Sequence, residues 1–181
     1  VDLSAGKFYA VGYENDFDTL IGIENVNMIG TFHDRIFGTG DNNSLKGNNG
    51  NDILDGKSGN DVLYGGNNND KLYGGNGNDK SYGQAGNDSL YMDAGNDTLD
   101  GGTGADTLIG GAGDDTLEGN QSDDTLEGGT GADELTGGLG EDVPATTVNK
   151  MCGSGMKTTM MGFDQIALGN TNTVITGGME S

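Results

Sequence analysis

Gly74-Gly75-Asn76-Gly77-Asn78-Asp79 returns later in the chain as Gly110-Gly111-Ala112-Gly113-Asp114-Asp115. Between these two copies and on either side of them, an acidic residue recurs every nine residues. The aspartates at this spacing are Asp34, Asp52, Asp61, Asp70, Asp79, Asp88, Asp97, Asp106, Asp115, Asp124, Asp133 and Asp142, with Asn43 at the one vacancy. An aliphatic residue follows most of them by two places, as Leu108 follows Asp106. A fixed period of this kind predicts a repeat architecture instead of an ordinary globular core.

The glycine content of each repeat excludes a helix, because each glycine in a helix interior costs about 1 kcal/mol relative to alanine. We expect the three residues around each aliphatic, such as Val62–Tyr64, to form a short strand with one side chain facing inward. The other six residues, with glycine at their first, second and fourth places, are expected to form a turn. Two repeats then make one coil, and equivalent repeats of successive coils stack at the strand spacing of about 4.8 Å.

This stacking predicts two columns of carboxylates. One column holds Asp52, Asp70, Asp88, Asp106, Asp124 and Asp142, and the other holds Asp61, Asp79, Asp97, Asp115 and Asp133. Carboxylates stacked at strand spacing cannot all stay ionised without a cation between them. Carboxylates together with glycine carbonyls suit a hard ion with six or more oxygen ligands, and a site of flexible carbonyls favours calcium over magnesium. We therefore expect several Ca²⁺ ions in the stack.

The composition is consistent with a protein that needs such an ion. The chain has 181 residues, 37 glycines, 31% hydrophobic residues and a net charge of -21. This charge disfavours nucleic acid and anionic lipid as partners, and no apolar run is long enough to span a membrane. One cysteine and one histidine exclude an internal disulfide framework and disfavour a zinc site. A glycine-rich acidic linker that binds no metal is the alternative interpretation.

Residues 16–142 resemble the RTX, or hemolysin-type, family, whose nonapeptide GGxGxDxUx is a calcium-binding β-helix repeat. The stretch Asp18–Val26 also looks like the segment that often precedes such arrays. The resemblance implies an all-β fold, a right-handed parallel β-roll that folds on binding calcium, and export by a type I secretion system. It also implies a secreted or cell-surface bacterial protein, in which the roll is an accessory to missing parent domains. No signal peptide is visible after Val1, and we expect a piece of a longer protein.

Several repeats depart from the family pattern. Asn43 lacks the charge and Asp41 replaces a glycine, so the first turns are expected to bind weakly or not at all. Ser81 replaces an inward aliphatic, Met92-Asp93 replaces a glycine pair, and Asn68 and Ser122 replace single glycines. Besides the column aspartates from Asp52 to Asp142, the expected calcium ligands are the carbonyls of Gly74, Gly77, Gly101, Gly104, Gly110, Gly113, Gly128 and Gly131.

The chain outside the repeats divides into two further segments. Residues 1–33 are more apolar and are expected to form an N-terminal capping coil, with strand-prone runs at Phe8–Val11 and Ile21–Ile29. His33 is expected to be a solvated turn residue. Residues 143–181 lose the period at Pro144, and we expect a helix ending near Leu168 and a short strand after it.

Residues 143–181 resemble the thiolase family, in which acyl groups pass to and from coenzyme A. The run Val148-Asn149-Lys150-Met151-Cys152-Gly153-Ser154-Gly155-Met156-Lys157 is similar to its nucleophile motif, and Gly177–Ser181 is similar to the start of a second segment. The resemblance implies that Cys152 accepts the acyl group from a coenzyme A thioester. The family's activating histidine and second cysteine have no counterpart here, so we do not expect a complete enzyme.

Three interpretations of this tail remain open from the sequence. It is a thiolase fragment joined to the roll by fusion or by an error in the gene model, a genuine cap of the roll, or a working acyltransferase. For the whole chain we expect a calcium-binding β-roll at residues 34–142 that supports the secretion, stability or adhesion of a parent protein. The alternative is an incomplete thiolase with Cys152 as its nucleophile.

Overall fold

One β-strand forms in nearly every repeat of the computed structural model, which describes residues 19–21, 25–27, 31–137 and 147–148. The strands are β1 (Thr19–Ile21), β2 (Asn25–Asn27), β3 (Arg35–Phe37), β4 (Ser44–Asn49), β5 (Ile53–Ser58), β6 (Val62–Asn67), β7 (Lys71–Asn76), β8 (Lys80–Ala85), β9 (Ser89–Tyr91), β10 (Thr98–Thr103), β11 (Thr107–Ala112), β12 (Thr116–Gln121), β13 (Thr125–Thr130), β14 (Glu134–Thr136) and β15 (Thr147–Val148).

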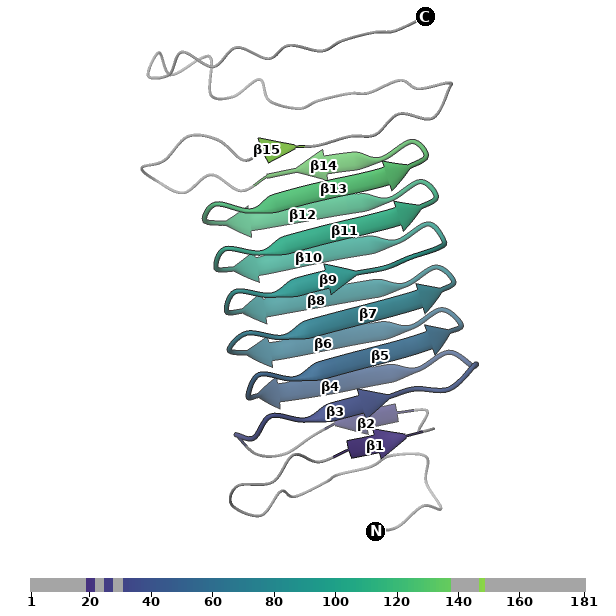
Figure 1. Ribbon diagram of the computed structural model, residues 1–181, viewed down its shortest axis with the longest axis vertical. Helices are drawn as coiled ribbons and strands as arrows, with labels where there is room; N and C mark the ends of the chain where they lie inside the picture. The colour runs from purple at the N-terminus through teal and green to yellow at the C-terminus, as the bar shows by residue number, and fades with distance from the viewer. Residues whose placement is uncertain (1–18, 22–24, 28–30, 138–146, 149–181) are drawn as a thin grey trace, which may run out of the picture.

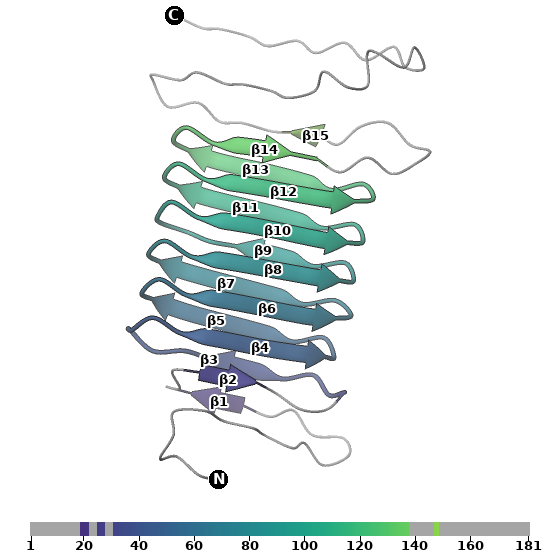
Figure 2. The same cartoon turned by 180° about the vertical axis from the view of Figure 1, so that it is seen from behind.

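The strands form two parallel sheets that face each other across a thin core. Odd-numbered strands follow one another from β1 to β15 in one sheet, and even-numbered strands run from β2 to β14 in the other. Every pairing is parallel and joins equivalent residues of successive coils, as Leu54 pairs with Leu72 and Leu99 with Leu117. Figures 1 and 2 show the coils stacked along the long axis with their strands across it. The predicted all-β parallel β-roll is thereby confirmed, with about 6 turns.

The strands are longer and the turns shorter than the sequence predicted. β7 includes Gly74 and Gly75, and only Gly77, Asn78 and Asp79 separate it from β8. Most strands therefore have six residues, not three, because the sheet pairing resumes at the second glycine of the pair after a bend. The second glycine of the pair adopts a left-handed conformation, with φ +100° at Gly75. A side chain is strained in this region, so glycine permits the bend within the strand.

The core is a single file of aliphatic side chains from each sheet. The inward residues are fully buried: Ile36, Leu45, Leu54, Leu63, Leu72, Leu90, Leu99, Leu108, Leu117 and Leu126. Leu135 is partly buried against them. Ser81 takes the inward place between Leu63 and Leu99, and its buried Oγ has no hydrogen-bond partner. With at most one inward aliphatic side chain in each repeat the core is thin, so apolar burial alone stabilises each coil weakly.

The outward positions also repeat from one coil to the next. Tyr64 stacks on Tyr82 with ring centroids 5.1 Å apart, and Tyr73 stacks on Tyr91 on the other sheet at 5.3 Å.

In the part of the chain that the structure describes, there is no helix of the length and hydrophobicity needed to cross a membrane.

At its two ends, the stack of coils reaches the segments predicted to form the cap and the tail. β1 and β2 already pair with β3 and β4, so the two sheets extend into the segment predicted to form the cap. β15 pairs with β13 beyond the last regular repeat. The strand predicted at Phe8–Val11 and the helix predicted to end near Leu168 lie outside the described residues.

Candidate metal centre

The repeat aspartates form two columns along the roll, one at each edge where the strands begin. Each aspartate from Asp52 to Asp133 accepts, through Oδ1, a hydrogen bond from the main-chain N–H of the equivalent residue one coil earlier. Asp88 N–H donates to Asp106 Oδ1 over 2.7 Å, and the same bond recurs from Asp34 to Asp133 with lengths of 2.6 to 3.2 Å. The side chains are buried, with 1% exposure at Asp70 and 8% at Asp133. The period therefore places carboxylates inside the roll.

The second oxygen, Oδ2, of each column carboxylate from Asp52 to Asp133 has no hydrogen-bond partner among the described residues. Buried Oδ2 atoms without a hydrogen bond occur at Asp52, Asp61, Asp70, Asp79, Asp88, Asp97, Asp106, Asp115, Asp124 and Asp133. A buried polar atom without a partner costs about 1–3 kcal/mol, and more when it is charged. Ten such atoms at equivalent positions indicate a ligand that the chain itself does not provide.

Glycine, which has no side chain, allows the close approach of Oδ2 at every column aspartate from Asp52 to Asp133 except Asp97. A Cβ atom on Gly83 would lie 2.5 Å from Asp88 Oδ2 and 2.6 Å from the Gly101 carbonyl oxygen. We call this space a carboxylate cradle: the open side of a repeat's first glycine, the next column aspartate along the chain, and the carbonyl of the equivalent glycine one coil later. Complete cradles are Gly47/Asp52/Gly65, Gly56/Asp61/Gly74, Gly65/Asp70/Gly83, Gly83/Asp88/Gly101, Gly101/Asp106/Gly119 and Gly110/Asp115/Gly128. Oxygen atoms from two successive coils thus converge where a side chain would otherwise sit.

The first repeat differs from the others because Asn43 stands at its column position in place of an aspartate. Asn43 Oδ1 accepts a hydrogen bond from the Thr39 N–H over 2.7 Å, and Asn43 Nδ2 donates to Thr39 Oγ1 over 3.1 Å. Both polar atoms of this side chain are therefore satisfied within the chain. That the first turns bind calcium weakly or not at all stays a prediction.

A second ladder, on the outside of the turns, was missed by the sequence analysis. Asn78 N–H donates to Asn60 Oδ1 over 2.8 Å, and Asn96 N–H donates to Asn78 Oδ1 over 3.0 Å. In the same way, Asn69 N–H donates to Asn51 Oδ1. This ladder begins at the exposed His33, whose Nδ1 accepts the Asn51 N–H over 2.6 Å. The signal was present in the sequence, since asparagine directly precedes each column position from Asn42 to Asn96. These side chains hold successive turns in register from the solvent side.

The predicted glycine ligands fall into two groups. Gly74, Gly101, Gly110 and Gly128 are first-place glycines and line the cradles. Gly77, Gly104, Gly113 and Gly131 are fourth-place glycines with φ of +125° to +136°, and they pack on the main chain of the equivalent turn one coil earlier. Asn68 and Ser122 replace such glycines and keep the left-handed conformation, with φ of 78° and 85°. Asp142 and Cys152 lie outside the described residues.

Burial disfavours the charged form of the column aspartates. Desolvation raises the pKa of Asp61, Asp88 and Asp115 to about 6, of Asp97 and Asp106 to about 7, and of Asp70 to about 8. The hydrogen bond from the main chain lowers these pKa values and neighbouring carboxylates raise several of them, but desolvation is the larger effect. The metal-free roll therefore holds its aspartates in an unfavourable state at neutral pH.

This electrostatic cost predicts the pH dependence of the metal-free chain. Because the pKa of these aspartates is higher in the folded form than the ordinary 3.8, folding takes up protons. The stability of the metal-free roll is then greatest below about pH 4 and is lost as pH rises through 6 to 8. Circular dichroism in chelator should show more strand signal at pH 5.5 than at pH 8. Strand signal that increases with pH in chelator would contradict this prediction, and sedimentation at both pH values controls for association.

The donor set fits a hard divalent cation. Carboxylate and carbonyl oxygens are the ligands that Ca²⁺ prefers, and the cradles contain no nitrogen donor. Within the described ranges, no three His, Cys, Asp or Glu side chains gather as a metal cluster. The columns instead bring together one Oδ2 and one main-chain carbonyl oxygen in each complete cradle along the stack.

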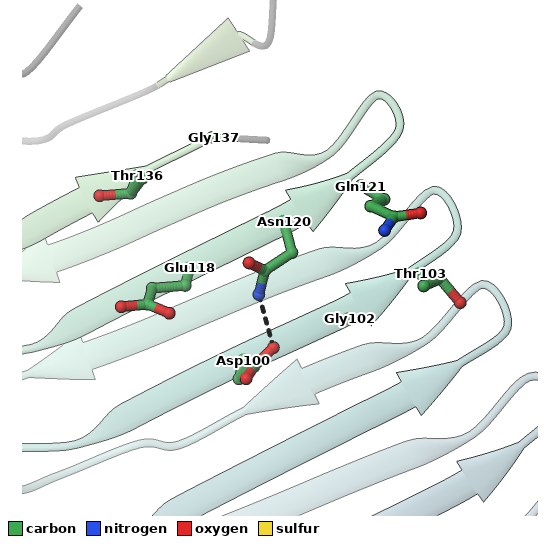
Figure 3. A pocket seen from close by; sticks show the side chains of 8 residues that line it. All are labelled: Asp100, Gly102, Thr103, Glu118, Asn120, Gln121, Thr136 and Gly137. Atoms are coloured by element: carbon green, nitrogen blue, oxygen red, sulfur yellow. Dashed lines mark hydrogen bonds between the residues drawn. The ribbon is translucent and has the colours of Figure 1, made fainter. Parts of the chain in front are cut away.

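A shallow hollow on the outer face of the even-numbered sheet is separate from these columns. It has a volume of about 480 Å³ and is lined by Asp100, Gly102, Thr103, Glu118, Asn120, Gln121, Thr136 and Gly137 (Figure 3). Asn120 Nδ2 donates a hydrogen bond to Asp100 Oδ1 over 2.7 Å across its floor. These polar groups face solvent, whereas the column oxygens are buried without partners. The columns are therefore the candidate site.

The C-terminal part of the chain is similar to thiolases over a short length. The family model for the thiolase N-terminal domain matches residues 123–181. A probable acetyl-CoA acyltransferase of Staphylococcus aureus (strain NCTC 8325 / PS 47) is 49% identical over 41 residues, which is 23% of this chain and 10% of that protein. A protein of the same name from Staphylococcus epidermidis is 51% identical over the same length and the same shares. The chain thus spans about a tenth of these curated relatives.

The comparison with solved structures finds no significant match. The repeats themselves, in contrast, match a second family model. The model of the RTX calcium-binding nonapeptide repeat matches residues 29–63, 55–90 and 91–126, which together cover more than half of the chain. Both resemblances found in the sequence are thereby confirmed. The chain belongs to the family of RTX calcium-binding nonapeptide repeat proteins.

Proposed function

We propose that the roll folds when Ca²⁺ enters the carboxylate cradles, and that it serves as an accessory module of a larger extracellular protein. The observation that carries this proposal is the set of ten buried Oδ2 atoms without partners. Their number and regularity support a role for the missing ligand in folding. RTX repeats are calcium-binding, which supports Ca²⁺ as that ligand.

In this proposal each ion is held by oxygens of two successive coils. The carboxylates are those of Asp52, Asp61, Asp70, Asp88, Asp106 and Asp115, with the glycine carbonyls of their complete cradles. A bound Ca²⁺ supplies positive charge between stacked carboxylates and replaces the hydrogen bonds that Oδ2 lacks. The remaining column positions are Asp79, Asp97, Asp124 and Asp133, and the period of the sequence adds Asp142. Further candidate ligands from the turns are the carbonyls of Gly77, Gly104, Gly113 and Gly131.

Titration calorimetry of the full chain tests whether calcium binds to several sites. We expect more than one Ca²⁺ per chain and little heat from Mg²⁺ at equal concentration. Mg²⁺ demands a small octahedral shell at about 2.0–2.1 Å, which flexible carbonyls do not impose. Absence of calcium binding, or equal binding of both ions, would contradict the proposal.

The biological setting follows from the same calcium dependence. A chain that stays unfolded at low calcium and folds outside the cell suits type I export from a bacterium into a calcium-rich medium. The high negative charge of -21 keeps the unfolded form in solution until the ion is available. We therefore propose a secreted or cell-surface protein, with residues 1–33 as cap, residues 34–142 as the calcium-binding unit, and parent domains beyond this chain.

Similarity to thiolases favours a second candidate function for residues 143–181. In this alternative Cys152 accepts an acyl group from a coenzyme A thioester, as the matched relatives' name suggests. A cysteine followed by Gly153-Ser154-Gly155 before a helix would have its thiolate stabilised by the helix N-terminus. Mass spectrometry after incubation with acetyl-coenzyme A tests this candidate, with Cys152→Ser as control. Acetylation of the wild-type chain alone would support it, and an unmodified Cys152 would leave the tail as an inactive fragment.

A further inference from the structure

Met92 occupies a place that glycine holds in the neighbouring coils. The equivalent residues one coil before and one coil after it are Gly74 and Gly110, both first-place glycines of a cradle. Met92 is fully buried and is part of the hydrophobic core, although it is not one of the inward aliphatic residues. A long side chain has therefore entered the roll where the other coils keep space for oxygen atoms.

The sulfur of Met92 lies in the cradle of the preceding coil. At Gly83 and Gly56, a Cβ atom would meet the carbonyl oxygen of the next coil at 2.6 and 2.9 Å. At Gly74 the corresponding neighbour is Met92 Sδ at 2.8 Å, beside Asp79 Oδ2 at 2.5 Å. A thioether sulfur thus stands where a carbonyl oxygen stands in the complete cradles.

Met92 also fills the open side of its own cradle, which belongs to Asp97. In the cradles of Gly83 and Gly101, the Cβ position lies only 2.5 Å from an aspartate Oδ2. A real side chain at this place excludes anything else from the space next to Asp97. One residue therefore obstructs two successive positions in the same column.

The coil accepts this side chain with a local change only. β9 ends at Tyr91, whereas most strands have six residues, and Asp93 takes a left-handed φ of 61°. The stacking continues, because Met92 N–H donates to the Ile109 carbonyl over 3.0 Å and Ala94 bridges to both neighbouring coils. The backbone of the roll is intact around Met92, so the substitution affects the cradles more than the fold.

We propose that Met92 is a plug that closes the Asp79 and Asp97 cradles to Ca²⁺ and divides one of the two metal columns into separate blocks. The inference rests on the proposed function, since it presumes that the complete cradles bind calcium. Ca²⁺ is a hard ion that takes oxygen ligands, and a thioether is a soft donor that it does not select. The Asp61 cradle then lies on one side of the plug and the Asp115 cradle on the other. The opposite column, through Asp70, Asp88 and Asp106, is uninterrupted.

Calcium stoichiometry of the full chain tests the plug directly. Met92→Gly is expected to bind at least one more Ca²⁺ per chain than the wild type in titration calorimetry. Met92→Leu keeps a side chain of similar size without sulfur, and it is expected to bind the wild-type number. Equal stoichiometry in Met92→Gly and the wild type, or a gain in Met92→Leu, would overturn the proposal. If the wild type binds no calcium, the proposed function fails instead.

A reciprocal pair of variants keeps the test decisive if Met92→Gly does not fold. Gly83→Met introduces the same side chain into the other column and is expected to lose at least one bound Ca²⁺ relative to the wild type. Gly40→Met is the matched control, because a Cβ atom on Gly40 would meet nothing within 4 Å. We expect the wild-type number of ions in Gly40→Met. Undiminished binding by Gly83→Met would show that a methionine does not close a cradle.

Discussion

Chelation of calcium is expected to abolish most of the strand signal of the roll in circular dichroism at pH 8, and added Ca²⁺ should restore it. The reason lies in the imbalance between a thin core and a large buried charge. Most repeats bury one medium aliphatic side chain, and ten buried carboxylate oxygens have no hydrogen-bond partner among the described residues. Without a cation the folded form keeps that cost, whereas the unfolded chain hydrates every carboxylate.

The size of the effect follows from ligand linkage. An ion that binds only the folded form at 100 times its Kd contributes about 2.7 kcal/mol per site. Six complete cradles acting together would contribute about 16 kcal/mol on that basis. This equals or exceeds the net stability of about 5–15 kcal/mol of ordinary domains. Occupied cradles can therefore decide whether the roll folds.

Two controls separate ion binding from simple charge screening. Mg²⁺ at the same concentration should restore little signal, and 1 M sodium chloride in chelator should not substitute for calcium. Salt screens exposed charges over about 3 Å at 1 M but reaches buried pairs much less. Strand signal that persists in chelator, or that returns with sodium chloride alone, would show that the roll does not need a bound ion.

The architecture was predictable because the period sets several features at once. A nine-residue repeat with one inward aliphatic requires two repeats per coil, and this brings Leu54 over Leu72 and Asp88 next to Asp106. Burial of the carboxylates follows from their place beside the inward side chain. The strand boundaries did not follow, because the preference of glycine for turns hides that Gly74 and Gly75 continue β7.

Two features of the site depend on contacts between coils that a single repeat does not reveal. The outer asparagine ladder has the same period as the aspartates, and only the structure shows that Asn60 Oδ1 accepts the N–H of Asn78. Met92 was recognisable as a replaced glycine. Its sulfur, however, enters the cradle of Asp79, which belongs to an earlier repeat of the sequence and to the neighbouring coil in space. The contact between the Met92 sulfur and the Asp79 cradle depends both on how the coils stack and on the direction that a flexible side chain takes.

Replacement of Asp106 by asparagine is expected to remove at least one bound Ca²⁺ and to raise the calcium concentration at half-folding about tenfold, which corresponds to about 1.4 kcal/mol. Asparagine keeps Oδ1, so the hydrogen bond from the Asp88 N–H remains possible. It replaces the anionic Oδ2 by an amide NH2 group, whose nitrogen cannot ligate a cation. Asp114→Asn is the matched control, because Asp114 is exposed and its Oδ1 accepts the Ala132 N–H over 2.8 Å, as an asparagine can.

The direction of the change in chelator distinguishes a lost ligand from a damaged fold. Asp106→Asn removes a buried charge whose pKa is raised by desolvation to about 7. The metal-free variant should therefore have as much strand signal as the metal-free wild type, or more, although it responds less to calcium. Asn43 shows that a neutral amide is accommodated at a column position, where Thr39 satisfies both of its polar atoms. A variant that loses strand signal in chelator and in calcium alike would mean that Asp106 supports the fold by a route other than cation binding.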